Sequence, residues 1–362
     1  MKKVAFLGAS VTAQTYARET GEMTGYVEAF REVYAAGLDF EEVIVHAYPG
    51  NRLTDAGLIL AQEILKQKPD VVILELTIED RSRGSDFDER HLNHLTQRFI
   101  GNGIFPVFFV MPKPDRDDAG EDLACEMIRR FVEAADLPFC EIYLPPGSKR
   151  SDYYRDGVHT NIDGALYYAD GLATFLREFD DKHWKKTRSG FSIRRLASNL
   201  RGIVGKLDCF LGRANPGVSC FHIRSIVAPK SGNFKTIVIR NHAPKKAGGS
   251  IWLIQRQEIG NHSPVIDVKL LTTSGEWRTH QTSIWDSYCH YPRHSFVTLV
   301  KVDRHDFKKI RIKVSSTLPN YAACRREHDD TLAQTSLYMR SYQPFWVISD
   351  SAVDLSIKIW RR

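Results

Sequence analysis

The sequence lacks any long apolar run. None of its uninterrupted apolar stretches approaches the roughly 18 residues that a membrane-spanning helix needs. Lys2 and Lys3 open the chain as in a signal peptide, but the apolar stretch 4–9 falls short of a secretory segment of about 7–15 residues. We therefore expect a cytoplasmic protein that begins with a buried strand.

The cysteines lack the spacing of a metal site or a disulfide framework. No C-x-x-C pair occurs among the six cysteines, and no histidines cluster beside them; they are Cys125, Cys140, Cys209, Cys220, Cys289 and Cys324. Reduced cytosolic thiols fit this usage better than zinc ligands or disulfides. A Gly-rich phosphate loop and an RNA-binding aromatic motif are also missing, so nucleic acid is a disfavoured partner. We expect neither a metal nor a cofactor.

Tryptophan is absent from residues 1–180, and cations are scarce there. That part has 19 Lys and Arg against 31 Asp and Glu, whereas 181–362 has 31 against 13 and all six tryptophans. Two composition shifts at one position predict a domain boundary near residue 180. The opposite charges leave two readings open. The domains attract each other, or the basic region 181–362 meets an anionic partner such as an acidic glycan, a phospholipid surface or nucleic acid.

Residues 1–180 alternate between apolar strands and amphipathic helices. Strands are expected at 4–7, 42–46, 71–76, 105–110 and 139–143, and helices at 23–36, 54–66, 89–100, 120–135 and 162–179. Strands that are apolar throughout are typical of a parallel sheet covered on both faces. The pattern predicts an α/β domain with a flavodoxin-like sheet. Its ligand site is then expected at the carboxyl ends of the strands.

Polar residues at those strand ends suggest nucleophilic catalysis. Ser10 follows the first strand, and a serine hydroxyl becomes a nucleophile when a base takes its proton. His159 could be that base, and Asp156, three residues earlier, could hold its ring in the required tautomer. Each residue also has a plain structural role as a helix cap or turn residue, and it is their joint placement that points to a site. Backbone N–H groups at Ser10 and Gly50 could face an oxyanion.

These blocks resemble those of the SGNH (GDSL-like) hydrolases, over about residues 1–180. The family's first block, G-D-S after a strand, is similar to Gly8-Ala9-Ser10, and its oxyanion glycine to Gly50. Its third block, G-x-N-D, is similar to Thr77-Ile78-Glu79-Asp80, and its last, D-x-x-H, to Asp156-Gly157-Val158-His159. The resemblance implies ester cleavage or acyl transfer through an acyl-serine. Ser10 would be the nucleophile, His159 the base and Asp156 its orienting acid.

Two positions depart from the family pattern. Ala9 replaces an aspartate that does no chemistry, and Glu79 replaces the asparagine that donates to the oxyanion. Glu79 would donate only if burial kept it protonated. Asn51, beside Gly50, is the alternative side-chain donor, and an exposed pairing of Glu79 with a nearby arginine is the structural alternative.

The second half reads as an all-β domain. Strands are expected at 218–227, 234–239, 251–257, 265–271, 296–302, 310–314, 337–342 and 353–360, several with clean alternation. They predict a β-sandwich or jelly roll over 211–362, a common architecture of carbohydrate-binding modules. We expect residues 181–210 to form a basic amphipathic linker, which either bridges the two domains or lies on an anionic membrane surface.

Three functions compete. The leading hypothesis is a serine esterase that removes acyl groups, here acetyl, from a carbohydrate or polysaccharide. The second is an O-acyltransferase of the same family that modifies a polysaccharide or its precursor, with a sugar hydroxyl in place of water. The third is a non-catalytic protein that binds a glycan or another anion on the same fold.

Overall fold

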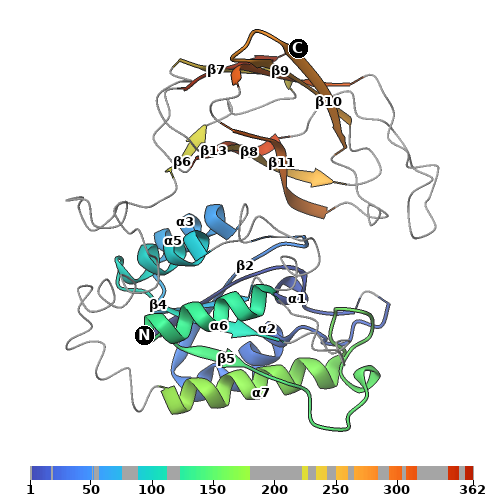
Figure 1. The fold of residues 1–362 in the computed structure, drawn as a ribbon. Coiled ribbons are helices and arrows are strands. Elements are labelled where there is room, and N and C mark those ends of the chain that lie inside the picture. The colour runs from blue at the N-terminus through green and yellow to red at the C-terminus, as the bar shows by residue number, and fades with distance from the viewer. Residues whose placement is uncertain are drawn as a thin grey trace. The chain divides into compact units, whose positions relative to one another are not determined.

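The protein is described here by a computed structural model. It describes residues 2–17, 19–50, 52, 57–75, 89–111, 123–179, 222–226, 234–242, 250–259, 265–283, 293–303, 307–315, 341–349 and 355–361. The chain divides into two compact units, Met1–Ser219 and Cys220–Arg362 (Figure 1). The predicted linker 181–210 lies outside the described residues.

The first unit is built on a five-stranded parallel sheet. Its strands are β1 (Lys2–Gly8), β2 (Phe40–Ala47), β3 (Val71–Glu75), β4 (Phe105–Val110) and β5 (Phe139–Glu141). They lie in the order β2-β1-β3-β4-β5, and every neighbouring pair is parallel. This is the flavodoxin-like order, so the predicted α/β fold class is confirmed.

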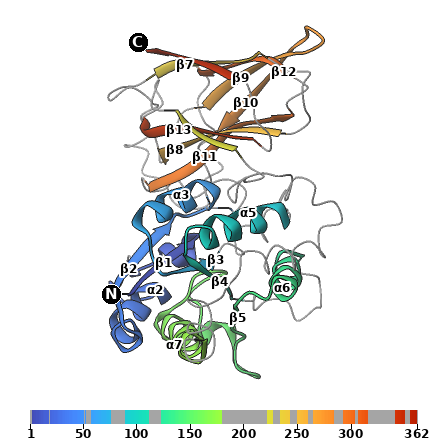
Figure 2. The same cartoon turned by 90° about the vertical axis from the view of Figure 1, so that its left-hand side faces the viewer.

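Helices cover both faces of this sheet. They are α1 (Ser10–Ala13), α2 (Tyr26–Ala29), α3 (Leu58–Gln67), α5 (Glu89–Ile100), α6 (Leu123–Ala135) and α7 (Ile162–Phe179), with short 3-10 turns η2 (Ala36–Leu38) and η4 (Arg150–Asp152). Figure 2 shows α3 and α5 on one face, with α2 and α7 on the other. The helix predicted over 23–36 begins only at Tyr26 and continues as a π-helix, η1 (Phe30–Tyr34).

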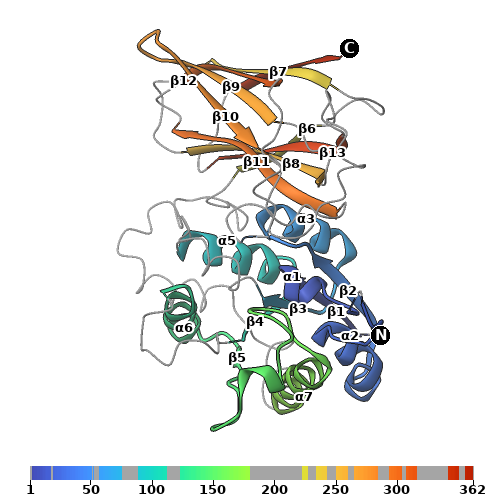
Figure 3. The same cartoon turned by 90° about the vertical axis from the view of Figure 1, so that its right-hand side faces the viewer.

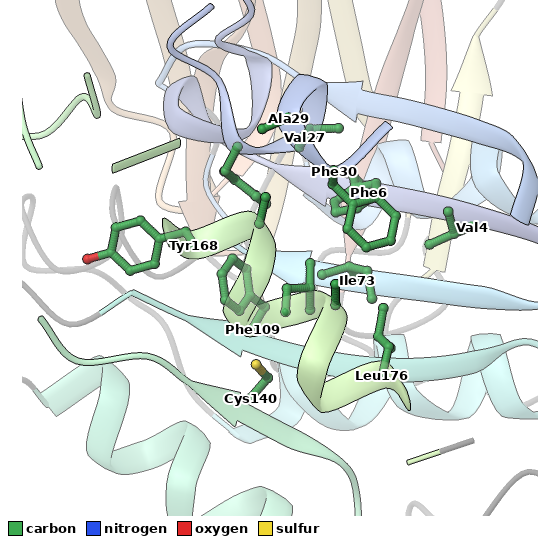
Figure 4. Close-up of a cluster of buried hydrophobic side chains, with 14 of the residues drawn as sticks. Val4, Phe6, Val27, Ala29, Phe30, Ile73, Phe109, Cys140, Tyr168 and Leu176 are labelled. Atoms are coloured by element: carbon green, nitrogen blue, oxygen red, sulfur yellow. The ribbon is translucent and has the colours of Figure 1, made fainter. Parts of the chain in front are cut away.

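The core beneath α2 and α7 is apolar and largely aromatic. Phe6 makes edge-on ring contacts with Tyr26 and with Phe30, at centroid separations of 6.0 and 5.4 Å. Figure 4 shows Phe6 and Phe30 among the other apolar side chains of this cluster. Alternate strand residues supply this layer, because successive side chains of a strand point to opposite faces. The buried aromatic layer fixes α2 and α7 relative to the ends of the strands.

The second unit consists of two antiparallel sheets, seen as two layers in Figure 3. One has the order β11-β8-β13-β6 and the other β10-β9-β12-β7-β14. The strands are β6 (His222–Ile226), β7 (Phe234–Asn241), β8 (Ser250–Ile259), β9 (Val265–Thr272), β10 (Trp277–Ser283), β11 (Arg293–Asp303), β12 (Phe307–Val314), β13 (Ser341–Ser349) and β14 (Leu355–Arg361). From β6 to β13 the sheets interleave as in an eight-stranded jelly roll. β14 adds a ninth strand beside β7.

Two strands of this unit differ from the prediction. No strand was expected at Trp277–Ser283, where β10 forms the edge of its sheet; residues 277–281 are exposed, so no apolar alternation marks the strand. The strand expected at 337–342 instead runs from Ser341 to Ser349. Pro344 interrupts the pattern there, and the register with β8 shifts between Ser341 and Phe345. A proline cannot donate to the ladder, so it sits at such an irregularity.

None of the helices within the described residues is long and apolar enough to cross a membrane.

Candidate active site

Ser10 is the first residue of α1, directly after β1 ends at Gly8. The turn between them is tight. A Cβ at Gly8 would lie 2.0 Å from Thr12 Oγ1 and 2.7 Å from the Glu75 carbonyl oxygen. Only glycine therefore lets α1 approach β3 this closely. Ser10 is partly exposed while its neighbours Ala9 and Val11 are buried, so the turn leaves the serine accessible at the carboxyl ends of the strands.

Asp156 and His159 form a hydrogen-bonded pair in the segment between β5 and α7. His159 Nδ1 lies 2.9 Å from Asp156 Oδ2 and 3.2 Å from Oδ1. Asp156 Oδ1 also accepts the backbone N–H groups of Val158 and His159, at 2.8 and 2.7 Å. The carboxylate thus organises the turn and orients the imidazole at the same time. With the Nδ1 proton donated to Asp156, Nε2 of His159 carries a lone pair and can act as a base.

The environment keeps Asp156 ionised. Burial by itself would raise the pKa of this half-exposed carboxyl group. The hydrogen bonds from the His159 side chain and backbone, the charge of His159 and the Val158 N–H outweigh burial and hold the pKa of Asp156 well below its ordinary value. A carboxylate that stays charged also favours the imidazolium that forms when the base takes a proton.

A side chain of the Ser10 segment connects α1 to the His159 segment. Gln14, which follows α1, donates from Nε2 to the carbonyl oxygen of Thr160 at 2.8 Å and also to that of Thr24. Thr160 donates from Oγ1 to the same Thr24 carbonyl oxygen at 2.6 Å. Gln14 and Thr160 are both buried. The structure therefore holds the segments of Ser10 and His159 side by side, although 149 residues of sequence separate the two residues.

A buried polar network lies behind the serine turn. Thr12 Oγ1 donates to Glu75 Oε2 at 3.1 Å and lies 3.0 Å from the Tyr26 hydroxyl. Burial raises the pKa of Tyr26 well above its ordinary value, and the negative charge of Glu75 raises it further. The hydrogen bond with Thr12 lowers the pKa, but by less. Tyr26 thus stays protonated. Because the single Thr12 proton goes to Glu75, the Tyr26 hydroxyl donates to Thr12. The relay fastens α1 to β3 and to α2.

Gly50 follows β2 in a left-handed backbone conformation, with φ of 72°. Such a φ favours glycine, since any Cβ strains it. In a parallel sheet the carboxyl ends of β1 and β2 share one edge, so Gly50 and Ser10 belong to the same edge. The other two predicted oxyanion residues, Asn51 and Glu79, lie outside the described residues.

Four residues of this region were not predicted from the sequence: Gln14, Thr160, Thr12 and Glu75. Glu75 alone carries a local signal, since it is a carboxylate at the end of an otherwise wholly apolar strand, and the structure buries it completely. The other three bond to partners far away in the chain. Among the described residues, no group of three or more His, Cys, Asp or Glu side chains could hold a metal ion.

Fold and site together define a three-layer α/β domain with polar groups at the carboxyl edge of its sheet, followed by a jelly-roll domain. No family model and no curated protein matches the sequence. Among solved structures, the chain is similar to a two-domain esterase, CEX, active on acetylated mannans. The TM-score is 0.56 at 12% sequence identity, over 100% of this chain and 92% of CEX. A second crystal structure of CEX, with mannopentaose, gives a TM-score of 0.57 at 12% identity over 100% and 91%. At this identity the similarity shows a shared fold.

Proposed function

We propose that the protein is an SGNH-like serine esterase that removes acetyl groups from a carbohydrate. The observation that carries the proposal is the His159–Asp156 pair, tied through Gln14 to the segment that presents Ser10. The fold shared with an esterase active on acetylated mannans supports the substrate class. The D-x-x-H arrangement before the last helix supports the SGNH type.

In this mechanism His159 Nε2 takes the hydroxyl proton of Ser10 as the serine oxygen attacks the ester carbonyl carbon. The backbone N–H groups of Ser10 and Gly50 donate to the oxyanion, with Asn51 as the candidate side-chain donor. The intermediate collapses as the carbon–oxygen bond to the sugar breaks, and His159 returns the proton to the departing sugar oxygen. Water then gives a proton to His159 and attacks the acyl carbon; the bond to the Ser10 oxygen breaks, acetic acid leaves, and His159 returns the proton to Ser10.

The test is labelling with a fluorophosphonate, which reacts with activated serines, followed by intact-mass measurement. We expect wild type to gain a single phosphonyl group and both Ser10→Ala and His159→Ala to gain none. Ser151→Ala is the matched control, because Ser151 is an exposed serine of the same unit and its loss should leave labelling unchanged. Absence of labelling in folded wild type would contradict the esterase and favour a non-catalytic glycan-binding protein.

Unlabelled wild type and Ser10→Ala would then be given acetylated mannan and acetylated xylan, with released acetate as the readout. Acetate release that requires Ser10 supports hydrolysis. Acetyl transfer from a small acetyl donor to a sugar hydroxyl, with little free acetate, would instead assign the same acyl-serine to an O-acyltransferase.

A further inference from the structure

The outer face of the five-stranded sheet in the second unit is strongly basic. Strand residues alternate between the two faces, and Ile237, Ile239, Ile310 and Ile312 are buried. The residues that alternate with them along the strands point outward. Six of these outward residues are cations, and together they are called here the basic face: Arg240, Lys269, Lys309, Arg311, Lys313 and Lys358. All of them are exposed except Lys309, which is partly exposed.

Little negative charge offsets these cations. Asp267 is the one carboxylate at an outward position among the described residues of this sheet, and it already accepts a hydrogen bond from Gln281 Nε2 at 2.8 Å. None of the six cations forms an ion pair with a carboxylate in the part of the chain that the structure describes. Asp267 stands in register opposite Lys313, and within the described residues no other carboxylate lies on this face, so its positive charge is in excess.

Two pairs of these cations stand directly opposite each other on adjacent strands. Lys309 pairs in register with Arg240, and Arg311 pairs with Lys269. Neighbouring strands are about 4.8 Å apart, and like charges placed directly opposite each other destabilise a sheet. An anionic group between the members of each pair would relieve this repulsion.

Trp277 adds an aromatic surface at one corner of the basic face. Its side chain is 50% exposed, it pairs in register with Leu271, and Leu271 in turn pairs with Lys309. An exposed indole at the corner of a basic face can pack against the apolar C–H face of a sugar ring while a cation of that face meets a carboxylate further along the sugar chain.

We propose that the basic face binds an acidic polysaccharide, one whose sugars carry carboxylates. An extended anionic chain can follow the cations from β9 across β12 to β7 and place carboxylates between the like-charged pairs. A membrane surface would favour several apolar anchors, and a nucleic-acid strand several stacking rings. In the second unit, Trp277 is the one exposed large apolar side chain among those described.

The proposal goes beyond the esterase and stands without it, because binding at this face requires no acyl chemistry. Binding would therefore be measured on the full chain with Ser10→Ala, which removes hydrolysis from the readout. The probes are polygalacturonate, a neutral mannan, vesicles containing phosphatidylserine and single-stranded DNA.

The test variant is K269Q/R311Q, which removes a like-charged pair from the basic face. The matched control is R278Q/K308Q, which removes two exposed cations of β10 and β12 that are not part of the basic face. Arg278 pairs in register with the buried Leu270, and Lys308 lies at the register shift between Phe307 and Lys309. We expect polygalacturonate to bind more tightly than the other three probes, and K269Q/R311Q to weaken that binding about 10-fold while the control leaves it unchanged. Added salt should weaken the binding of wild type.

Thermal unfolding of both variants checks that they fold. K269Q/R311Q should unfold at the same or a higher temperature than wild type, because a repulsive pair is gone. Equal loss of binding in both variants would overturn the proposal in favour of net charge alone. Tighter binding of DNA or of vesicles would overturn it in favour of that partner, and absence of polygalacturonate binding would overturn it outright.

Discussion

Gln14 and Thr160 are joined by a hydrogen bond of 2.8 Å from Gln14 Nε2 to the Thr160 carbonyl oxygen, across 146 positions of sequence. Gln14 ends the serine segment, and Thr160 directly follows His159. A catalytic serine and its base must be held in near-attack geometry, and small misplacements are costly. This bond, within the first unit, holds the segment of Ser10 next to the segment of Asp156 and His159.

Replacing Gln14 with methionine should therefore affect both stability and activity. Gln14→Met removes the donor and leaves the buried Thr160 carbonyl oxygen without it, which should cost about 1–3 kcal/mol in unfolding free energy. The kcat for ester hydrolysis should fall by up to about 100-fold as the two segments loosen. Urea unfolding and initial rates measure the two effects.

Gln67→Met is the control for Gln14→Met. Gln67 ends α3 and bonds to His46 in an exposed contact, so its loss should change stability by less than about 0.5 kcal/mol. Loss of stability in Gln14→Met with full kcat would mean that the bond is structural only.

The relay behind the serine turn predicts coupling between Thr12 and Tyr26. Thr12→Val removes the hydroxyl that Glu75 and Tyr26 share, and should cost about 1–3 kcal/mol. Tyr26→Phe removes the other end of the relay. In a double-mutant cycle the two changes should couple by about 0.5–3 kcal/mol. Tyr167→Phe, which loses an exposed bond to the Tyr143 carbonyl oxygen, should be additive with Thr12→Val. Additivity of Thr12→Val with Tyr26→Phe would contradict the relay.

Asp156 should make the stability of the fold depend on pH. Its pKa is lowered in the folded protein, so its carboxylate stabilises the fold above the unfolded value of about 3.8. This stabilisation is lost as the pH falls below that value and the folded carboxyl group takes up its proton. The difference in unfolding free energy between wild type and Asp156→Asn should therefore become smaller as the pH is lowered from about 5 to about 2.5. Urea titrations of both proteins across this range measure it, and a constant difference would show that Asp156 contributes no linked stabilisation.

Gly50 should be sensitive to a Cβ for two separable reasons. With φ of 72°, Gly50→Ala should cost about 1–2 kcal/mol through backbone strain. Gly103 has φ of 76° in the turn before β4, at the amino ends of the strands and so away from the candidate site. Gly103→Ala should cost a similar amount of stability. Gly50→Ala alone should lower kcat, by about 10²- to 10³-fold, if its N–H faces the oxyanion. Equal kcat values for both variants would remove Gly50 from the site.

Much of the first unit could be predicted because its strands are continuous apolar runs. Residues such as 71–75 and 105–110 are buried on both faces, so composition alone marks them. β10 could not be predicted in this way, since an edge strand with exposed residues on both faces has no apolar period. The π-helix after α2 also escapes prediction, because a helical period does not distinguish 3.6 residues per turn from a wider turn.

The residues of the candidate site also fall into those that a local pattern marks and those that it does not. Ser10, Asp156 and His159 could be predicted because each stands at a boundary that local patterns mark, and the Asp156–His159 pair lies within three residues. The proposed roles of Glu79 and Asn51 remain predictions. Thr12 and Gln14 could not be predicted, because their partners are 63 and 146 residues away.

Local patterns of charge and hydrophobicity are enough to place the two domains in their classes and to mark the strand ends where chemistry is expected. They depend only on a residue and its near neighbours, which is why one sequence can display them. Tertiary structure alone shows that a buried glutamate, a threonine and a tyrosine form one relay, and that Gln14 connects the segment of Ser10 to the segment of His159. It also sets the register that places cation opposite cation on the second unit's sheet. In each case the interaction free energy arises between two groups that are distant in the sequence, and only folding brings those groups together.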